Sequence, residues 1–333
     1  MTSRRVNSPV RRLRISGEII YKIFNNRASI LRTIVLVLFC AALASQTAAQ
    51  NGEASATKHR LKKVRVNSVE LHYLESGKGI PVIFVHAGLD DYREWEAQLE
   101  RFSQNYHVIA YSRRYNFPNN NPHLRPDHSA IIEAQDLAAL INRLKLGRVH
   151  IVGHSYGALT ALWLAIKHPE LIRSLVLAEP PVLRWAQDKP EGRALFDEFM
   201  NNIWKPVGDA FRRGEKERAL RLTLNYFAGE GVFDQVPEVQ RNYWRSNLRE
   251  WQALTTSRDA IPPLSRDDVR RIKAPVLMLS GAQTLNIHKF VDSELQPLLA
   301  NGERLVIPNA THEMWSEQPE VCGRTVLAFL SRN

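Results

Sequence analysis

The pentapeptide Gly153-His154-Ser155-Tyr156-Gly157 constrains this chain more than any other stretch, because it stands between a β-branched run and a helical pattern. The strand-like run covers residues 149–152, and the small and apolar residues 158–165 favour a helix. A glycine on each side of a central serine lets a strand and a helix approach closely across a sharp turn. The pattern predicts a nucleophile elbow, in which the hydroxyl of Ser155 stands clear of the backbone.

The first fifty residues differ in composition from the rest of the chain. They contain eight basic residues and one acid, so they carry most of the formal charge of +11. An apolar run at residues 33–43 precedes Thr47-Ala48-Ala49, which places small residues where a signal peptidase cleaves. We therefore predict a bacterial signal peptide over residues 1–49 and an exported protein, periplasmic or secreted. An uncleaved membrane anchor is the alternative, although the run is shorter than the roughly 20 residues that a spanning helix needs.

After cleavage, about 280 residues would remain, which is enough to bury the core of one domain. Cys322 would then be the one remaining cysteine, so we expect no internal disulfide. No run of basic and aromatic residues indicates nucleic-acid binding. We expect a small-molecule substrate, no cofactor, no metal, no nucleic-acid partner and no stable membrane span after cleavage; no oligomeric state is predicted.

Short β-branched runs alternate with helical patterns from about residue 63 onward, which is typical of a mostly parallel sheet with helices on both faces. Residues 64–66 and 69–73 favour an antiparallel pair at the sheet edge, and residues 95–102 favour a helix. Further strands are expected at residues 81–85, 106–111, 149–152, 174–178, 276–280 and 304–307.

Residues 183–264 break this rhythm, since aromatic and aliphatic residues recur there at helical spacing. We predict a helical cap inserted into a core made of residues 50–182 and 265–333. Most of its aromatic residues are expected to pack against one another, while a minority line a substrate pocket beneath the insertion. Pro262-Pro263 would end the insertion.

In strand order, elbow position and insertion position, the chain resembles the α/β-hydrolase superfamily over essentially all of the part that follows the leader. The likeness is most specific at the elbow, at Phe84-Val85-His86-Ala87-Gly88 and at Asn309-Ala310-Thr311-His312. The resemblance implies an α/β fold with a central, mostly parallel sheet, and a serine hydrolase with a catalytic triad and an oxyanion hole.

The resemblance assigns Ser155 as the nucleophile and His312, which follows the last expected strand, as its base. Many members place the acid after the strand that here ends at Ser280, yet residues 281–286 contain no carboxylate. The end of the strand before the insertion is another family position for the acid, so we predict Glu179. Alternatively, Glu179 caps or positions the insertion, and the triad is completed by another residue or reduced to a dyad.

The oxyanion hole needs two backbone N–H groups that face the developing negative charge. By resemblance these belong to Tyr156, directly after the nucleophile, and to Gly88, with Leu89 as the neighbouring possibility. His86 is expected to hold this loop by hydrogen bonds, and one member of the pair Arg113-Arg114 is expected to brace the loops near the site.

The expected reaction is hydrolysis of a carboxylic ester or a lactone through an acyl-enzyme. A carbon–carbon bond hydrolase and a cofactor-free perhydrolase would use the same triad, so both stay open as alternatives. A small-molecule binding protein that has lost turnover is a third. A serine at the nucleophile position argues against the haloalkane dehalogenase and epoxide hydrolase branches, which use an aspartate there.

Overall fold

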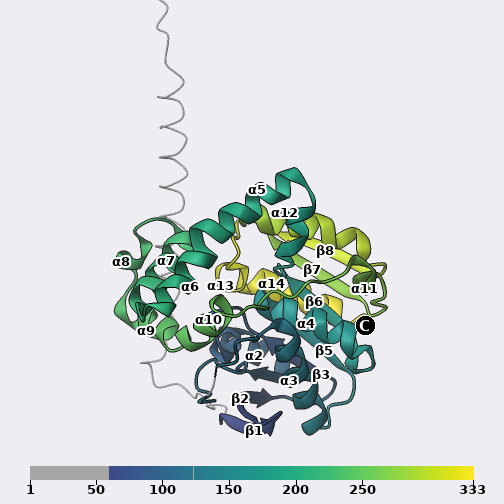
Figure 1. Ribbon diagram of the computed structural model, residues 1–333. Helices are drawn as coiled ribbons and strands as arrows, with labels where there is room; N and C mark the ends of the chain where they lie inside the picture. Colours follow the sequence, from purple (N-terminus) through teal and green to yellow (C-terminus); the bar gives the residue numbers. More distant parts are fainter. Residues whose placement is uncertain (1–59, 123) are drawn as a thin grey trace, which may run out of the picture.

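The computed structural model describes residues 60–122 and 124–333 (Figure 1). The signal peptide predicted over residues 1–49 lies outside the described residues. Among the helices of the described part, none has the length and apolar character needed to cross a membrane. Cys322 is buried and carries a free thiol.

One sheet of eight strands organises the described chain, in the order β1-β2-β4-β3-β5-β6-β7-β8. β2 runs antiparallel to β1 and to β4, and all other neighbours are parallel. The strands are β1 (Lys62–Val66), β2 (Val69–Ser76), β3 (Pro81–Val85), β4 (His107–Tyr111), β5 (Val149–His154), β6 (Ile172–Ala178), β7 (Val276–Gly281) and β8 (Gly302–Ile307). The predicted antiparallel edge pair and mostly parallel sheet are confirmed.

Helices cover both faces of the sheet because successive side chains of a strand point to opposite faces. On β3, Ile83 and Val85 pack with the helices of one layer, while Val82 and Phe84 pack with those of the other. The first layer contains α3 (Ala130–Arg143), α4 (Tyr156–Lys167) and α12 (Asn286–Leu295); the second contains α2 (Glu96–Ser103), α13 (Met314–Glu317) and α14 (Pro319–Leu330). The short helix α11 (Arg266–Arg270) leads into β7.

Between β6 and β7 the chain leaves the sheet and forms a group of helices beside it, drawn in green in Figure 1. They are α5 (Pro190–Phe199), α6 (Lys205–Arg212), α7 (Lys216–Ala228), α8 (Val232–Gln235), α9 (Glu238–Arg245) and α10 (Leu248–Thr255). This group occupies the region expected to form the cap. A π-helical turn at Met200–Trp204 joins α5 to α6, whose second residue is Pro206; its ring nitrogen cannot donate a helical hydrogen bond.

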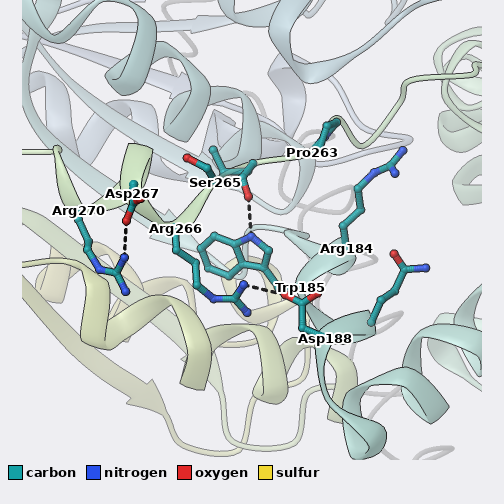
Figure 2. A pocket seen from close by; sticks show the side chains of 10 residues that line it. Arg184, Trp185, Asp188, Pro263, Ser265, Arg266, Asp267 and Arg270 are labelled. Carbon is teal, nitrogen blue, oxygen red and sulfur yellow. Dashed lines mark hydrogen bonds and ion pairs between the residues drawn. The ribbon is translucent and has the colours of Figure 1, made fainter.

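The two connections between this helical group and the sheet are tied together around a surface pocket of about 510 Å³ (Figure 2). The indole Nε1 of Trp185, on the outgoing connection, donates to the carbonyl oxygen of Leu264, on the returning one, at 2.7 Å. Arg266 lies over the Trp185 ring, 4.8 Å from its centroid, and pairs with Asp188 at 2.7 Å. Both ends of the helical group are therefore fixed to each other.

Parallel strands end at the same edge of a sheet, so the loops that follow them meet there. The loops after β3, β5, β6, β7 and β8 carry, in that order, Gly88, Ser155, Glu179, Thr284 and His312. The topology thus gathers residues that are more than 200 positions apart in the chain.

Candidate active site

Ser155 occupies a strained turn between β5 and α4. Its backbone has φ 50° and ψ −118°, which is rare for a residue with a side chain and costs on the order of 1–3 kcal/mol. The N–H of Ser155 donates to the carbonyl oxygen of Ala178 at 2.8 Å, so the turn is held against the end of β6. This is the sharp strand-to-helix turn that the sequence predicts.

The flanking glycines permit this turn because the backbone of neighbouring elements lies against them. A Cβ atom on Gly157 would lie 2.2 Å from the carbonyl oxygen of Val85, and one on Gly153 would lie 2.7 Å from the Cα of Ala158. Both distances are far below a van der Waals contact. The two glycines therefore let α4 start directly beside β3 and β5.

Glu179 and His312 form a close pair. The carboxylate Oε2 of Glu179 lies 2.5 Å from Nδ1 of His312, and the Glu179 side chain is fully buried. Since Nδ1 donates to this carboxylate, Nε2 of His312 holds the lone pair that can accept a proton. His312 and Ser155 line the same cavity.

The Glu179 carboxylate is also held by the loop after β7. Oε1 accepts the N–H of Gly281 at 2.7 Å, and Oε2 accepts the hydroxyl of Thr284 at 2.7 Å. Glu179 itself has φ 49°, and this unusual conformation directs its side chain across to β7. The loop that lacks a carboxylate thus supplies donors to the carboxylate of the neighbouring strand.

The electrostatic surroundings keep His312 uncharged. Burial and the positive charge of His154 hold the pKa of His312 well below the ordinary value of 6.5. A neutral imidazole is the form that can take a proton from a serine hydroxyl.

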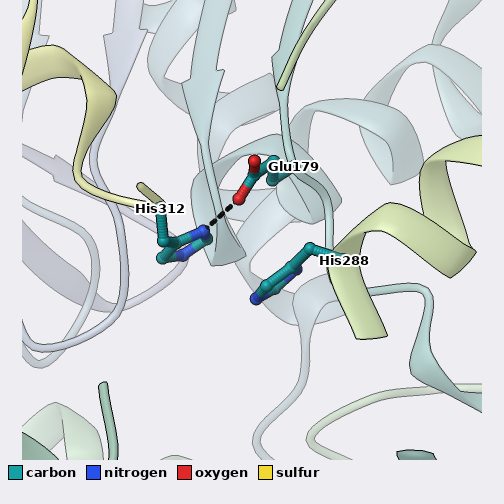
Figure 3. A group of neighbouring side chains, drawn as sticks. All are labelled: Glu179, His288 and His312. Atoms are coloured by element: carbon teal, nitrogen blue, oxygen red, sulfur yellow. Dashed lines mark hydrogen bonds and ion pairs between the residues drawn. The ribbon is translucent and has the colours of Figure 1, made fainter. Parts of the chain in front are cut away.

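A second histidine, His288, covers the ring of His312 (Figure 3). The ring centroids lie 4.3 Å apart with an interplanar angle of 12°, and burial lowers the pKa of His288 to about 3. Among the described residues, Glu179, His288 and His312 are the one group of histidines, cysteines and acids with donor atoms close enough for a metal, within 4.8 Å. The parallel rings do not direct their lone pairs to one point, so the arrangement fits a stacked base better than a metal site.

Backbone donors of the loop after β3 have fixed partners on both sides of Gly88. The N–H of Ala87 donates to Oε2 of Glu94 at 2.8 Å, and the N–H of Leu89 donates to Oε2 of Glu250 at 2.9 Å. Leu89, the neighbouring possibility for the oxyanion hole, is therefore engaged elsewhere. Gly88 and Tyr156 both line the cavity with Ser155, and Tyr156 is the first residue of α4, whose N-terminal N–H groups favour negative charge.

Arg113 braces this loop from a fully buried position. Its guanidinium donates to the carbonyl oxygens of His86 at 3.2 Å and Ala87 at 2.9 Å, and to Oε1 of Glu250 on α10 at 2.7 Å. His86 accepts the N–H of Arg113 at 2.9 Å, so it holds the loop as expected. The other arginine, Arg114, pairs with Asp136 on α3 instead.

The cavity in front of Ser155 has a volume of about 790 Å³ and two kinds of lining. Helices α5 to α10 contribute aromatic and aliphatic side chains, namely Phe199, Trp204, Leu224, Tyr226, Phe227, Val232, Trp244 and Trp251. The segments that follow β3 and β8 contribute five acids, namely Asp90, Glu94, Glu96, Glu313 and Glu317. Part of the aromatic content of the helical group thus faces the pocket.

Comparison with known proteins identifies the family. A family model described as "Alpha/beta hydrolase family" matches residues 82–324. The chain belongs to the alpha/beta hydrolase family. The hydrolase is 23% identical over 273 residues to (E)-2-((N-methylformamido)methylene)succinate hydrolase of Acinetobacter baylyi, covering 79% of this chain and 95% of that protein.

Two further relatives differ in the chemistry that their names state. 2-Hydroxy-6-oxo-6-(2'-aminophenyl)hexa-2,4-dienoic acid hydrolase of Metapseudomonas resinovorans is 24% identical over 306 residues, 86% of this chain and 96% of that protein. The solved structure of a thermophilic esterase from Thermogutta terrifontis has a TM-score of 0.66 and 22% identity, covering 82% of this chain and 98% of that one. That likeness shows the shared fold.

Several residues of the hydrolase's site had no sequence prediction. Glu250 lies on α10, 161 positions from the loop residue that it holds, and no local pattern signals such a contact. Glu94 and His288 stand on a 3₁₀ turn and a helix respectively, where their types are ordinary. Thr284 was detectable in principle, because the loop that lacks a carboxylate still offers a hydroxyl there.

Proposed function

We propose that this hydrolase cleaves carboxylic esters or lactones through an acyl-enzyme formed on Ser155. The observation that carries the proposal is the strained elbow serine in one cavity with a neutral histidine whose Nδ1 is bound to a buried carboxylate. A serine hydroxyl needs such a base to become nucleophilic near neutral pH.

In the proposed reaction, Oγ of Ser155 attacks the carbonyl carbon while Nε2 of His312 takes the hydroxyl proton. The N–H groups of Gly88 and Tyr156 stabilise the oxyanion. His312 returns the proton to the leaving alcohol, leaving an ester between the acyl group and Ser155. Water then attacks that ester with His312 as its base, and the acid is released. Glu179 holds His312 in one tautomer and stabilises its positive charge.

Labelling with a fluorophosphonate tests the nucleophile. Ser155 in the full chain is expected to be modified, as located by peptide mass spectrometry, and the Ser155→Ala variant is expected to stay unmodified. A folded protein that resists the reagent yet binds apolar esters would contradict the proposal and support the binding-protein alternative.

The charges of the cavity favour neutral substrates over anionic ones. Burial and the carboxylates of Glu94 and Glu317 raise the pKa of Glu313 to about 7, and burial raises that of Asp90. Arg93 is the one arginine or lysine lining the cavity among the described residues, and it pairs with Asp91 at 2.5 Å. A substrate carboxylate would therefore meet acids, because the two cationic groups that line the cavity, Arg93 and His154, already pair with Asp91 and Glu94.

A neutral substrate would differ from the substrates in the names of two relatives, a succinate and a dienoic acid. A matched pair of esters tests it: 4-nitrophenyl valerate and 4-nitrophenyl hemiglutarate, which differ in a terminal methyl or carboxylate group. We expect kcat/KM at least tenfold higher for the valerate, which corresponds to about 1.4 kcal/mol. Equal values, or a preference for the hemiglutarate, would refute a neutral substrate.

A further inference from the structure

His154, the residue before the predicted nucleophile, has two fixed acceptors. Its Nδ1 lies 2.6 Å from Oε1 of Glu94, and its Nε2 lies 2.9 Å from the carbonyl oxygen of His312. The side chain is buried, with 1% of its surface exposed. Because both partners are acceptors, both ring nitrogens must carry a proton for both bonds to form. The geometry therefore calls for an imidazolium.

Glu94 extends this contact to a third loop. While Oε1 binds His154, Oε2 accepts the N–H of Ala87 in the loop after β3. One carboxylate and one imidazolium thus connect the Gly88 loop, the elbow and the backbone of His312. Glu179 fixes the side chain of His312, and His154 fixes its main chain.

We propose that Glu94 and His154 are a positioning pair that sets the distance between the oxyanion hole and the catalytic histidine. The inference rests on the proposed acyl-enzyme mechanism. His154 is fully protonated in this arrangement, so it has no lone pair with which to act as a base. Its role is to hold two loops whose separation decides how Ser155, His312 and the oxyanion donors meet.

The groups around His154 support a charged ring. Burial lowers its pKa, but the carboxylates of Glu94, Glu313 and Asp90 outweigh burial and raise it to about 9. The other titratable neighbours are histidines held neutral, namely His86, His288 and His312, each of whose pKa is lowered partly by the charge of His154. The same charge that binds the loops therefore also keeps His312 available as a base.

The pair predicts how activity changes at alkaline pH. The pKa of His154 in the folded protein lies above its ordinary value of 6.5, so its stabilising effect is complete below that value and is lost as pH rises through about 9. Above that pH, a neutral ring can donate to Glu94 or to the His312 carbonyl, but not to both.

Glu94→Gln tests the pair, because an amide cannot accept from both Ala87 and His154 while keeping its own donors satisfied. We expect kcat for 4-nitrophenyl valerate to fall at least tenfold at pH 7.5, KM to stay within threefold, and the alkaline decline to move at least one pH unit lower. Glu75→Gln is the matched control, because Glu75 pairs with His107 at 2.6 Å on the sheet, away from the site. Its profile is expected to match that of the unaltered protein.

Imidazole nitrogen NMR of the full chain provides a readout that does not depend on turnover. Both nitrogens of His154 are expected to be protonated at pH 7.5, with the signal assigned by its loss in His154→Asn. A neutral His154, or a Glu94→Gln enzyme with unchanged kcat and alkaline limb, would overturn the inference. If Ser155 proves unreactive while His154 is charged, the proposed function fails and the structural pairing stands.

Discussion

At the scale of single residues, the site depends on Glu179 being held in one orientation. Its carboxylate accepts from Gly281, Thr284 and His312 at 2.5 to 2.7 Å. For Glu179→Gln we predict a loss of about 10⁴ in kcat with little change in KM, because an amide no longer fixes the tautomer and charge of His312. Steady-state kinetics on 4-nitrophenyl valerate measure this loss.

Asp292→Asn is the control for removing a buried carboxyl group near this site. Asp292 is fully buried and binds Ser280, and burial raises its pKa to about 7, yet it does not contact His312. That variant is expected to keep kcat within threefold. A Glu179→Gln enzyme with unchanged turnover would show that the triad acid lies elsewhere.

The sequence predicts the residues of this site that follow strand ends. It does not reveal the residues whose contacts join segments far apart in the chain. Ser155 and Glu179 stand directly after a recognisable strand and His312 lies in the loop after another, so the topology brings them together. His288 and Glu94 belong to helical turns, and their functional contacts appear only when the segments after β3, β5, β7 and β8 meet at one edge of the sheet. Their assignment therefore requires the three-dimensional arrangement.

At the scale of elements, the contact between β3 and the start of α4 leaves no room for a methyl group at Gly157. Its Cβ would lie 2.2 Å from the carbonyl oxygen of Val85 and 2.5 Å from that of His86. Gly157→Ala is expected to lower the free energy of unfolding by about 3 kcal/mol and to abolish fluorophosphonate labelling, since α4 must move away from β3. Urea unfolding and labelling are the two measurements.

Ala161→Gly, on the same helix, is the control that distinguishes this clash from a general loss of helix stability. Ala161 is fully buried within α4, and Ala161→Gly is expected to cost about 1 kcal/mol while labelling persists. Labelling of Gly157→Ala at the normal rate would contradict the close approach.

The elements themselves were largely predictable, because the β-branched runs and helical patterns are strong and alternate regularly. The strand prediction for residues 304–307 corresponds to β8, Gly302–Ile307, although Leu305 and Val306 are exposed on this edge strand. Inside the helical group, aromatic spacing indicates helices but gives no sign of the π-helical turn at Met200–Trp204 or of how α10 reaches Arg113. Those features depend on contacts with other elements.

At the scale of the whole molecule, Arg113 links the sheet, α3 and the helical group through buried charges. Its guanidinium lies 3.3 Å from Glu133 on α3 and 2.7 Å from Glu250 on α10, and all three side chains are at most 1% exposed. Buried pairs of this kind need not add stability overall, but removing one partner leaves the others charged without compensation. The helical group and the core should therefore unfold as one unit.

Arg113→Met tests this coupling. We expect the free energy of unfolding to fall by about 3 to 5 kcal/mol, because Glu133 and Glu250 lose their shared cation. Urea unfolding followed by tryptophan fluorescence and by circular dichroism should give one midpoint for the unaltered protein. In the variant, the fluorescence midpoint should come at a lower urea concentration, because tryptophans of the helical group detach first.

Adding Glu250→Gln to Arg113→Met should recover part of the lost free energy of unfolding, since one unpaired buried charge is removed. Arg125→Met is the control, because Arg125 forms an exposed pair with Asp127 at 2.8 Å that is worth less than about 1 kcal/mol. Equal midpoints for Arg113→Met and Arg125→Met would mean that apolar packing alone joins the helical group to the sheet.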